Sequence, residues 1–302
     1  MPKWFLETRP QFLFLSVALV LHGAGLAFWR QTALAGGASF HWVEFLLAMF
    51  GLVLLHASVN VLNDWHDMKT GIDLKTKRTP FSGGSGMLPE GAMTPGAVLA
   101  LGVGALAAGC AIGFYLVFVS GWQLLVIGLV GALLVAGYTP VFTRIGVGEI
   151  AAGLGLGLLP VVGVYFLLTG RLDLVAWVSG MPAFFLTYNL LFLNEFPDAE
   201  ADKAGGRHHM VILLGKKNAR WLYAAVEIAT YVTIVAGVVA GILTPWALLG
   251  LGAGFLAFQA IRGAIGDYDK FEELIPAQAA NVMAVLATSA LLAVGYLVAG
   301  LL

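Results

Sequence analysis

Charged residues and cysteines are both scarce in this 302-residue chain. Only 11% of its residues are Asp, Glu, Lys or Arg, against about 25% in ordinary soluble domains, and the net charge is −1. A chain without excess positive charge lacks the electrostatic basis for binding nucleic acid. The single cysteine, Cys110, excludes a disulfide within the chain and a metal site built from several thiolates. Because Cys110 lies within an apolar run, we expect it to pack as a small apolar side chain.

Apolar residues, in contrast, make up 60% of the chain, and the mean hydropathy is +0.90. A helix needs about 20 mostly apolar residues to cross a bilayer, and we find nine runs of that kind. The sequence therefore predicts an all-α, polytopic membrane protein with nine transmembrane helices. The expected spans are 11–31, 40–62, 96–119, 122–143, 148–169, 174–194, 219–240, 244–263 and 277–301. Small residues within them, such as Gly153, Gly155 and Gly157, should allow close helix packing.

Lysine and arginine are distributed unevenly between the two sides of these spans. With the N-terminus in the cytoplasm, every Lys and Arg except Arg30 and Arg171 falls at or near the cytoplasmic side, in agreement with the positive-inside rule. The sequence thus predicts a multi-pass protein of the cell membrane with a cytoplasmic N-terminus and an external C-terminus. Residues 1–10 contain no convincing cleavage site before the first span, so we expect that span to be retained.

Two acidic stretches follow the second and sixth expected spans, in long polar loops predicted at 63–95 and 195–218. Each stretch holds an Asn and an Asp four residues apart, a spacing that puts both on one helix face. The pairs are Asn63 with Asp67 and Asn194 with Asp198, and the further acids are Asp64, Asp73 and Asp202. Any one of these acids could be a solvated charge at a helix end. Two matched stripes on one side of a bilayer favour a functional site instead.

Carboxylate and amide oxygens are ligands that Mg²⁺ prefers, usually together with water and substrate phosphates. Basic residues stand close to both acidic stretches, and Lys and Arg bind phosphate oxygens and offset the negative charge that develops on them. The candidate diphosphate-binding cations are Lys69, Arg78, Arg144, Lys203 and Arg207. The alternative for any single one of them is the positive-inside bias alone. Acids and cations together favour a polyphosphate ligand held by Mg²⁺.

Other polar features near these stretches have competing interpretations. The segment 81–86, Phe-Ser-Gly-Gly-Ser-Gly, could bind phosphate through backbone N–H groups. It lacks the Lys of a P-loop, so the favoured interpretation is a lid hinge. His208 and His209 are interpreted as loop residues instead of ligands. Glu149, at the start of the fifth expected span, should either contact an acceptor or cap a helix.

These residues resemble the motifs of the UbiA superfamily of intramembrane prenyltransferases, and the resemblance covers almost the whole chain. The first motif reads Asn63-Asp64-x-x-Asp67 with Gly71-Ile72-Asp73, and the second reads Asn194-x-x-x-Asp198-x-x-x-Asp202-Lys203. They are most similar to the menaquinone-type branch, the 1,4-dihydroxy-2-naphthoate polyprenyltransferases. The resemblance implies one domain over 1–302, with nine helices around a central cavity. The chain departs from the family pattern at Pro197, where Arg is common, and at Arg144, the nearest substitute for a Lys.

The resemblance also implies an activity, the Mg²⁺-dependent transfer of a polyprenyl group from an isoprenyl diphosphate to an aromatic acceptor. Asp67, Asp198 and Asp202 would be catalytic by holding Mg²⁺, with Asp64 and Asp73 as further metal ligands. The expected diphosphate contacts are Asn63, Lys69, Arg78, Tyr138, Arg144, Asn194, Lys203 and Arg207. The branch resemblance implies 1,4-dihydroxy-2-naphthoate as acceptor, with hydroxybenzoate, homogentisate, chlorophyllide or a glycerol phosphate lipid as alternatives. The expected partners are these substrates and the lipid bilayer, and a homo-oligomer stays open.

Other classes of protein also stay open at this point. A transporter places acids in membrane helices, but its coupling carboxylates usually lie near mid-membrane at broken helices. Here every acid of the two stretches lies at a span end or in a loop. The CDP-alcohol phosphotransferases resemble this chain in using membrane-embedded Asp motifs, but in one contiguous motif instead of two separate ones. A non-catalytic scaffold would leave the paired acids unexplained.

Overall fold

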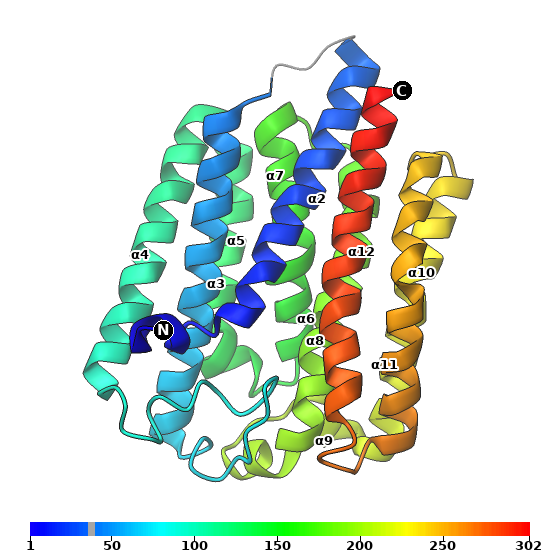
Figure 1. Ribbon diagram of the computed structural model, residues 1–302. Helices are drawn as coiled ribbons and strands as arrows, with labels where there is room; N and C mark the ends of the chain where they lie inside the picture. Colours follow the sequence, from blue (N-terminus) through cyan, green and yellow to red (C-terminus); the bar gives the residue numbers. More distant parts are fainter. Residues whose placement is uncertain (36–39) are drawn as a thin grey trace.

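The computed structural model describes residues 1–35 and 40–302, and within these ranges it contains helices and no strands. Nine helical segments of the described chain are long and apolar enough to cross a membrane. They are Pro10–Leu34, Trp42–Thr70, Pro95–Ser120, Trp122–Phe142, Gly148–Thr169, Leu174–Ala204, Lys216–Val239, Pro245–Asp267 and Ile275–Leu301. The all-α, polytopic membrane fold expected from the sequence is thus confirmed. Figure 1 shows these segments as an upright bundle, with the N-terminal helix toward its lower end and the C-terminus at its upper end.

Each apolar run forms a helix or a pair of joined helices. In chain order they are α1 (Lys3–Glu7), α2 (Pro10–Ala35), α3 (Trp42–Thr70), α4 (Pro95–Ser120), α5 (Trp122–Gly137), α6 (Gly148–Gly153), α7 (Leu159–Thr169), α8 (Leu174–Ala204), α9 (Met210–Leu214), α10 (Lys216–Val239), α11 (Gly254–Asp267) and α12 (Ile275–Leu301). Two π-helical turns, η1 (Tyr138–Phe142) and η2 (Leu154–Leu158), extend α5 and join α6 to α7. A 3₁₀ segment, η3 (Pro245–Ala253), precedes α11.

Two of the helices extend well beyond the apolar spans predicted for them. α3 continues to Thr70 and α8 to Ala204, so the loops predicted at 63–95 and 195–218 were placed too early. The acidic stretches therefore lie largely on the last turns of helices. Hydropathy marks the part of a helix that lies in lipid, whereas the helix itself ends where the backbone changes conformation. For α3 that point is Gly71, whose φ of 77° forms a left-handed C-cap.

The fifth span is broken near its middle, between α6 and α7. Leu156, within η2, has φ −118° and ψ 32°, which takes its carbonyl out of the helical hydrogen-bond pattern. The Thr187 hydroxyl of α8 donates to that carbonyl at 2.7 Å. Unpaired backbone groups inside a membrane are costly, and side chains from neighbouring helices commonly satisfy them. The break is thus supported by α8, the helix that carries the second acidic stretch.

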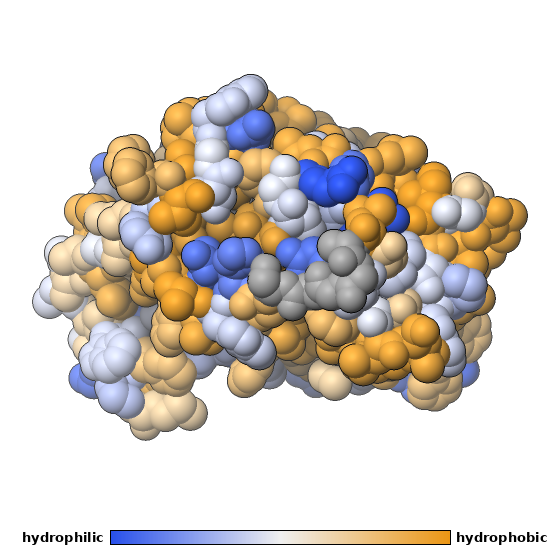
Figure 2. Space-filling model, turned by 90° about the horizontal axis from the view of Figure 1, so that it is seen from above, coloured by the Kyte–Doolittle hydropathy of each residue, from blue (hydrophilic) through white to orange (hydrophobic). Residues whose placement is uncertain are grey.

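The bundle has buried inner helices and lipid-facing outer ones. α7 is buried along most of its length, and α2 packs on both α7 and α12. α4 lies at one edge of the bundle in Figure 1, and α5 packs against it. Both expose large apolar side chains, such as Phe114, Phe118 and Leu133. Apolar areas also cover much of the end view in Figure 2. Cys110 lies within α4, as its apolar run predicts, and is exposed on this outer helix.

Glycines allow α8 to approach the broken fifth span closely. A Cβ added at Gly157 would lie 2.6 Å from the Ala183 carbonyl oxygen, and one at Gly153 would lie 2.9 Å from the Phe184 ring and its carbonyl oxygen. At Gly155 the added Cβ would meet only Leu134, at 3.5 Å, which is ordinary contact. The role predicted for small residues thus holds at Gly153 and Gly157.

This difference among the glycines predicts unequal effects on stability. Gly157→Ala should lower the free energy of unfolding by about 1–3 kcal/mol, because the backbone of α8 cannot yield easily to the new methyl group. Gly155→Ala adds the same methyl group without a close contact and should leave stability nearly unchanged. Thermal unfolding of the two variants in detergent measures the difference, and equal unfolding temperatures would contradict this account of the packing.

Candidate active site

The two acidic stretches meet at the lower end of the bundle as drawn in Figure 1. Asp67 lies on the last turn of α3 and Asp202 on the last turn of α8. Arg207, which follows α8, forms ion pairs with both of them, donating from Nη1 to Asp202 Oδ1 at 2.8 Å and from Nη2 to Asp67 Oδ1. One guanidinium group therefore links carboxylates from two helices far apart in the sequence.

A cavity opens beside this ion-pair network, with a polar end and an apolar end. Its polar lining includes Asn63, Asp67, Asp73, Tyr138, Asn194, Asp198, Asp202 and Arg207, all of them predicted site residues. Its apolar lining includes Phe12, Leu15, Val59, Leu134, Leu156 and Leu190, from α2, α3, α5, η2 and α8. A cavity of this kind suits a ligand with a charged head and an apolar tail.

Several acids at the polar end, or directly behind it, lack full compensation by positive charge; Asp73 and Asp198 line the cavity, whereas the predicted ligand Asp64 does not. Asp64 is almost fully buried; its Oδ2 accepts a hydrogen bond from the Ser85 N–H at 2.7 Å, while its Oδ1 has no hydrogen-bond partner among the described residues. Asp198 Oδ1 likewise has none. Burial, and then the neighbouring charges of Asp64 and Asp67, raise the pKa of Asp73 to about 8. Buried carboxylates in such a group require a cation or protons to be stable.

The segment 79–86 covers the cavity next to these acids. Gly83, Gly84 and Gly86 all have positive φ, and the chain from Phe81 to Gly84 lines the cavity. Ser85 ties the segment down, since its N–H binds Asp64 and its hydroxyl donates to Glu7 at 2.6 Å. The segment thus sits over the acids, as either of its predicted roles would require.

Four of the predicted diphosphate-binding cations do not line the cavity. Lys69 and Lys203 are exposed, and the ammonium group of Lys69 lies 5.2 Å from the Trp65 ring. Arg144 is exposed beyond η1, and Arg78 pairs with Glu90. Charge alone indicated these residues, and charge does not report which way a side chain points.

Arg9, at the cavity, and Glu7, which binds the segment 79–86 over it, were not among the predicted site residues. Arg9 lines the cavity and donates to the Phe81 carbonyl at 3.3 Å. Glu7 is fully buried and accepts a hydrogen bond from the Ser85 hydroxyl. Burial raises the pKa of Glu7 to about 7 despite that hydrogen bond. Both residues precede the first span, and neither belongs to a motif. Their only sequence signal was charge immediately before an apolar run.

His209 and Glu149 are also more closely involved than predicted. His209 lies in the connection between α8 and α9, as expected, but it is only 1% exposed, with Nε2 at 3.2 Å from Asp202 Oδ2 and Nδ1 at 3.6 Å from Glu195 Oε2. It is the N-cap residue of α9, a short helix that brings it against α8. Glu149 is fully buried and accepts a hydrogen bond from the Met210 N–H at 2.6 Å. It thus caps a helix, but the helix is α9 and not its own.

Comparison with known proteins identifies the family. Residues 24–273 match the model of the UbiA prenyltransferase family. A 1,4-dihydroxy-2-naphthoate octaprenyltransferase of Mycobacterium leprae is 30% identical over 263 residues, which cover 86% of this chain and 84% of the relative. The protein of the same name from Bacillus subtilis is 29% identical over 264 residues, covering 85% and 80%.

Solved structures agree with this fold. An apo UbiA homolog from Aeropyrum pernix has a TM-score of 0.69 at 18% identity, with 91% of this chain and 95% of that chain covered. A UbiA homolog from Archaeoglobus fulgidus, bound to GPP and Mg²⁺, has a TM-score of 0.69 at 14% identity, and both chains are covered completely. Since the family model spans most of the sequence, the chain belongs to the UbiA family and is a membrane-embedded prenyltransferase.

Proposed function

We propose that this enzyme transfers a polyprenyl group from an isoprenyl diphosphate to 1,4-dihydroxy-2-naphthoate, with Mg²⁺ as cofactor. The observation that carries the proposal is the single cavity in which acids of α3 and α8 lie at one end and apolar side chains at the other. An isoprenyl diphosphate has the same division into charged head and apolar chain. The acceptor is inferred from the name shared by the two relatives above.

The residues at the polar end fit Mg²⁺. Mg²⁺ prefers oxygen ligands and is usually held by one or two carboxylates together with phosphates and water. The unpartnered oxygen of Asp198 is of this type, and Asp67, Asp73 and Asp202 line the cavity with it. The unpartnered oxygen of Asp64 lies behind this lining, next to Gly84. Asn63 donates its amide N–H to Thr139 at 3.1 Å, which leaves its carbonyl oxygen as an acceptor. When bound, Mg²⁺ would supply Lewis-acid stabilisation of the departing diphosphate.

The side chains around the cavity have distinct roles in this proposal. Arg207 and Arg9 would offset the negative charge that grows on the diphosphate as its bond to the allylic carbon breaks. The apolar lining would exclude water, which would otherwise capture the allylic cation. An electron-rich ring carbon of the acceptor would then form the new bond to the cation. The ring would regain aromaticity by losing a proton, or its carboxylate as CO₂.

We also propose that the acid-lined end of the bundle faces the cytoplasm. The positive-inside bias supports this orientation, since the basic residues concentrate at that end in the expected topology. This orientation would place the diphosphate head at the end of the bundle that water reaches from the cytoplasm, and the prenyl chain among the helices. The C-terminus, at the opposite end in Figure 1, would then be external.

A product assay tests the proposed reaction. Purified protein is incubated with Mg²⁺, geranylgeranyl diphosphate and, separately, each of the acceptors named above, and products are identified by mass. We expect prenylated naphthoquinol from 1,4-dihydroxy-2-naphthoate at a rate well above that with any other acceptor. Preference for another acceptor would overturn the substrate assignment, and no Mg²⁺-dependent product from any of them would overturn the proposed reaction.

Gly84 gives a more local test of the metal site. A Cβ at Gly84 would lie 3.2 Å from Asp73 Oδ2 and 3.3 Å from Asp64 Oδ1, at a φ of +72°. Gly84→Ala should therefore raise the Mg²⁺ concentration for half-maximal rate by roughly tenfold, equivalent to about 1.4 kcal/mol. Gly91→Ala is the matched control, because Gly91 has φ +66° with nothing near its Cβ position.

Both glycine variants should lose about 1–2 kcal/mol of stability from the left-handed backbone alone. Only Gly84→Ala should change the Mg²⁺ dependence of the rate. If the two variants show the same Mg²⁺ dependence, the acids beside Gly84 do not hold the ion.

A further inference from the structure

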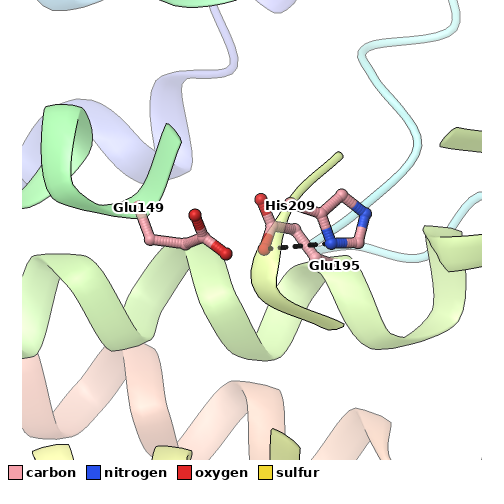
Figure 3. Close-up of side chains that lie close together, drawn as sticks. All are labelled: Glu149, Glu195 and His209. Atoms are coloured by element: carbon pink, nitrogen blue, oxygen red, sulfur yellow. Dashed lines mark ion pairs between the residues drawn. The ribbon is translucent and has the colours of Figure 1, made fainter. Parts of the chain in front are cut away.

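A second cluster of metal-ligating side chains lies behind the wall of the cavity. It consists of Glu149 on α6, Glu195 on α8 and His209 at the start of α9, and one ligand atom from each lies within 4.8 Å of the other two. Figure 3 shows the two carboxylates directed toward each other, with the imidazole of His209 beside Glu195. All three residues are buried, and neither Glu149 nor His209 lines the cavity.

The inward-facing atoms of this cluster have no hydrogen-bond partners among the described residues. They are Glu149 Oε2, Glu195 Oε2 and His209 Nδ1, of which the last two lie 3.6 Å apart as the ion pair marked in Figure 3. Nearly all buried polar groups have hydrogen-bond partners, so two carboxylates and an imidazole with buried atoms that lack them are unusual. Arg207, the guanidinium group beside them, already pairs with Asp67 and Asp202 in the described structure. His209 can supply one positive charge to Glu195, so the two carboxylates together need either a further proton or a metal ion between them.

The outward-facing atoms are oriented as they are around bound metals. A metal-ligating histidine usually presents its other ring nitrogen to a carboxylate, and ligating carboxylates are themselves hydrogen-bonded. His209 Nε2 lies 3.2 Å from Asp202 Oδ2 as an ion pair without an aligned hydrogen bond, and Nδ1 is the nitrogen that remains for the ion. Glu149 Oε1 accepts the Met210 N–H, which leaves Oε2 for the ion. Ligand bonds of about 2.0–2.2 Å would require only small side-chain rotations to close the cluster.

We propose that Glu149, Glu195 and His209 bind a divalent transition-metal ion of the zinc class, separate from the Mg²⁺ of the diphosphate site. Imidazole suits Zn²⁺ and its neighbours in the first transition row, whereas Mg²⁺ selects oxygen ligands and keeps several waters. The ion would join α6, α8 and the start of α9. Because Arg207 is two residues before His209, the ion would also fix the segment that positions Arg207 between Asp67 and Asp202.

Cobalt binding tests this site without any use of enzyme activity. Untagged, full-length protein in detergent is stripped with a chelator and titrated with Co²⁺ in excess Mg²⁺ and without prenyl diphosphate. We expect one equivalent of Co²⁺ per chain, with visible absorption bands from nitrogen and oxygen ligands, displaced by Zn²⁺ but not by Mg²⁺. A wild-type protein that binds clearly less than one equivalent, or loses Co²⁺ to Mg²⁺, overturns the proposal.

Matched variants assign the ion to its ligands. His209→Ala and Glu149→Gln should weaken Co²⁺ binding by more than the roughly 10–100-fold seen for supporting residues of metal sites. His208→Ala and Glu200→Gln change exposed neighbours of the same types and should bind as the wild type does. Asp198→Asn, at the diphosphate site, should also retain Co²⁺. Unchanged binding in His209→Ala and Glu149→Gln, or loss in Asp198→Asn alone, would place the ion elsewhere and overturn the assignment.

Zn²⁺-dependent stability provides a second readout of the same variants. An ion that binds the folded state raises the unfolding temperature. We expect Zn²⁺ to raise it in the wild type and in His208→Ala, but not in His209→Ala. An equal rise in all three proteins would contradict the proposed ligand set.

Discussion

Asp198→Asn should lower the rate of prenyl transfer by about 10²–10³-fold at saturating Mg²⁺, the scale at which single electrostatic contacts to a transition state are lost. Asp198 lines the cavity, and its Oδ1 is buried without a partner. Asparagine keeps the shape and one oxygen but removes the charge that would hold Mg²⁺ against the diphosphate. The loss should appear in kcat as well as in the Mg²⁺ requirement, because the charge on the leaving group grows during the reaction.

Glu200→Gln is the control for this variant. Glu200 is an exposed acid two residues away on α8 and does not line the cavity. Its neutralisation removes the same charge from the same helix and should change the rate little. A rate in Asp198→Asn within a few-fold of the Glu200→Gln rate would show that the second acidic stretch does not hold the cofactor.

Arg207→Gln should lower the free energy of unfolding by about 3–5 kcal/mol, the range found when one partner of a buried ion pair is removed. Its two partners, Asp67 and Asp202, are 5% and 2% exposed, so neither carboxylate can recover its charge compensation from water. Mg²⁺ should restore part of the lost stability, because it can neutralise the carboxylates that Arg207 leaves. The rise in unfolding temperature on adding Mg²⁺ should therefore be larger in Arg207→Gln than in the wild type.

Lys217→Gln serves as the control for loss of a basic charge in the same region. Lys217 is exposed on α10, and its replacement should leave both the unfolding temperature and its Mg²⁺ response unchanged. Thermal unfolding of both variants in detergent, each with and without Mg²⁺, gives the four unfolding temperatures to be compared with those of the wild type. An Arg207→Gln protein as stable as Lys217→Gln would mean that the ion pairs of Arg207 contribute nothing to the fold.

The membrane fold was predictable from the sequence because hydropathy reports directly on lipid exposure. The nine expected spans correspond to the nine membrane-length helices of the described chain. The spacing of Asn63 and Asp67, and of Asn194 and Asp198, also indicated a shared helix face, and the structure brings all four to one cavity. What hydropathy could not give was the ends of α3 and α8, since polar residues can continue a helix once it leaves the lipid.

The site residues that were missed depend on tertiary contacts. His209 is buried because α9 packs against α8. The five residues of α9, Met-Val-Ile-Leu-Leu, are all apolar and did signal burial, but they do not indicate which helix α9 contacts. Arg9 lines the cavity together with the segment 79–86 and donates a hydrogen bond to the Phe81 carbonyl of that segment. Lys69 and Arg78 illustrate the opposite error. Each stands beside an acidic stretch in the sequence, yet one lies over Trp65 and the other pairs with Glu90.

A structure with Mn²⁺ in place of Mg²⁺ and an unreactive prenyl thiodiphosphate would test the central claim most directly. Anomalous scattering would locate the Mn²⁺ ions in the crystal. The account predicts Mn²⁺ at about 2.0–2.2 Å from carboxylate oxygens of both α3 and α8, with the diphosphate bridging the two helices. Mn²⁺ bound to the acids of one helix only, or a diphosphate outside this cavity, would contradict it.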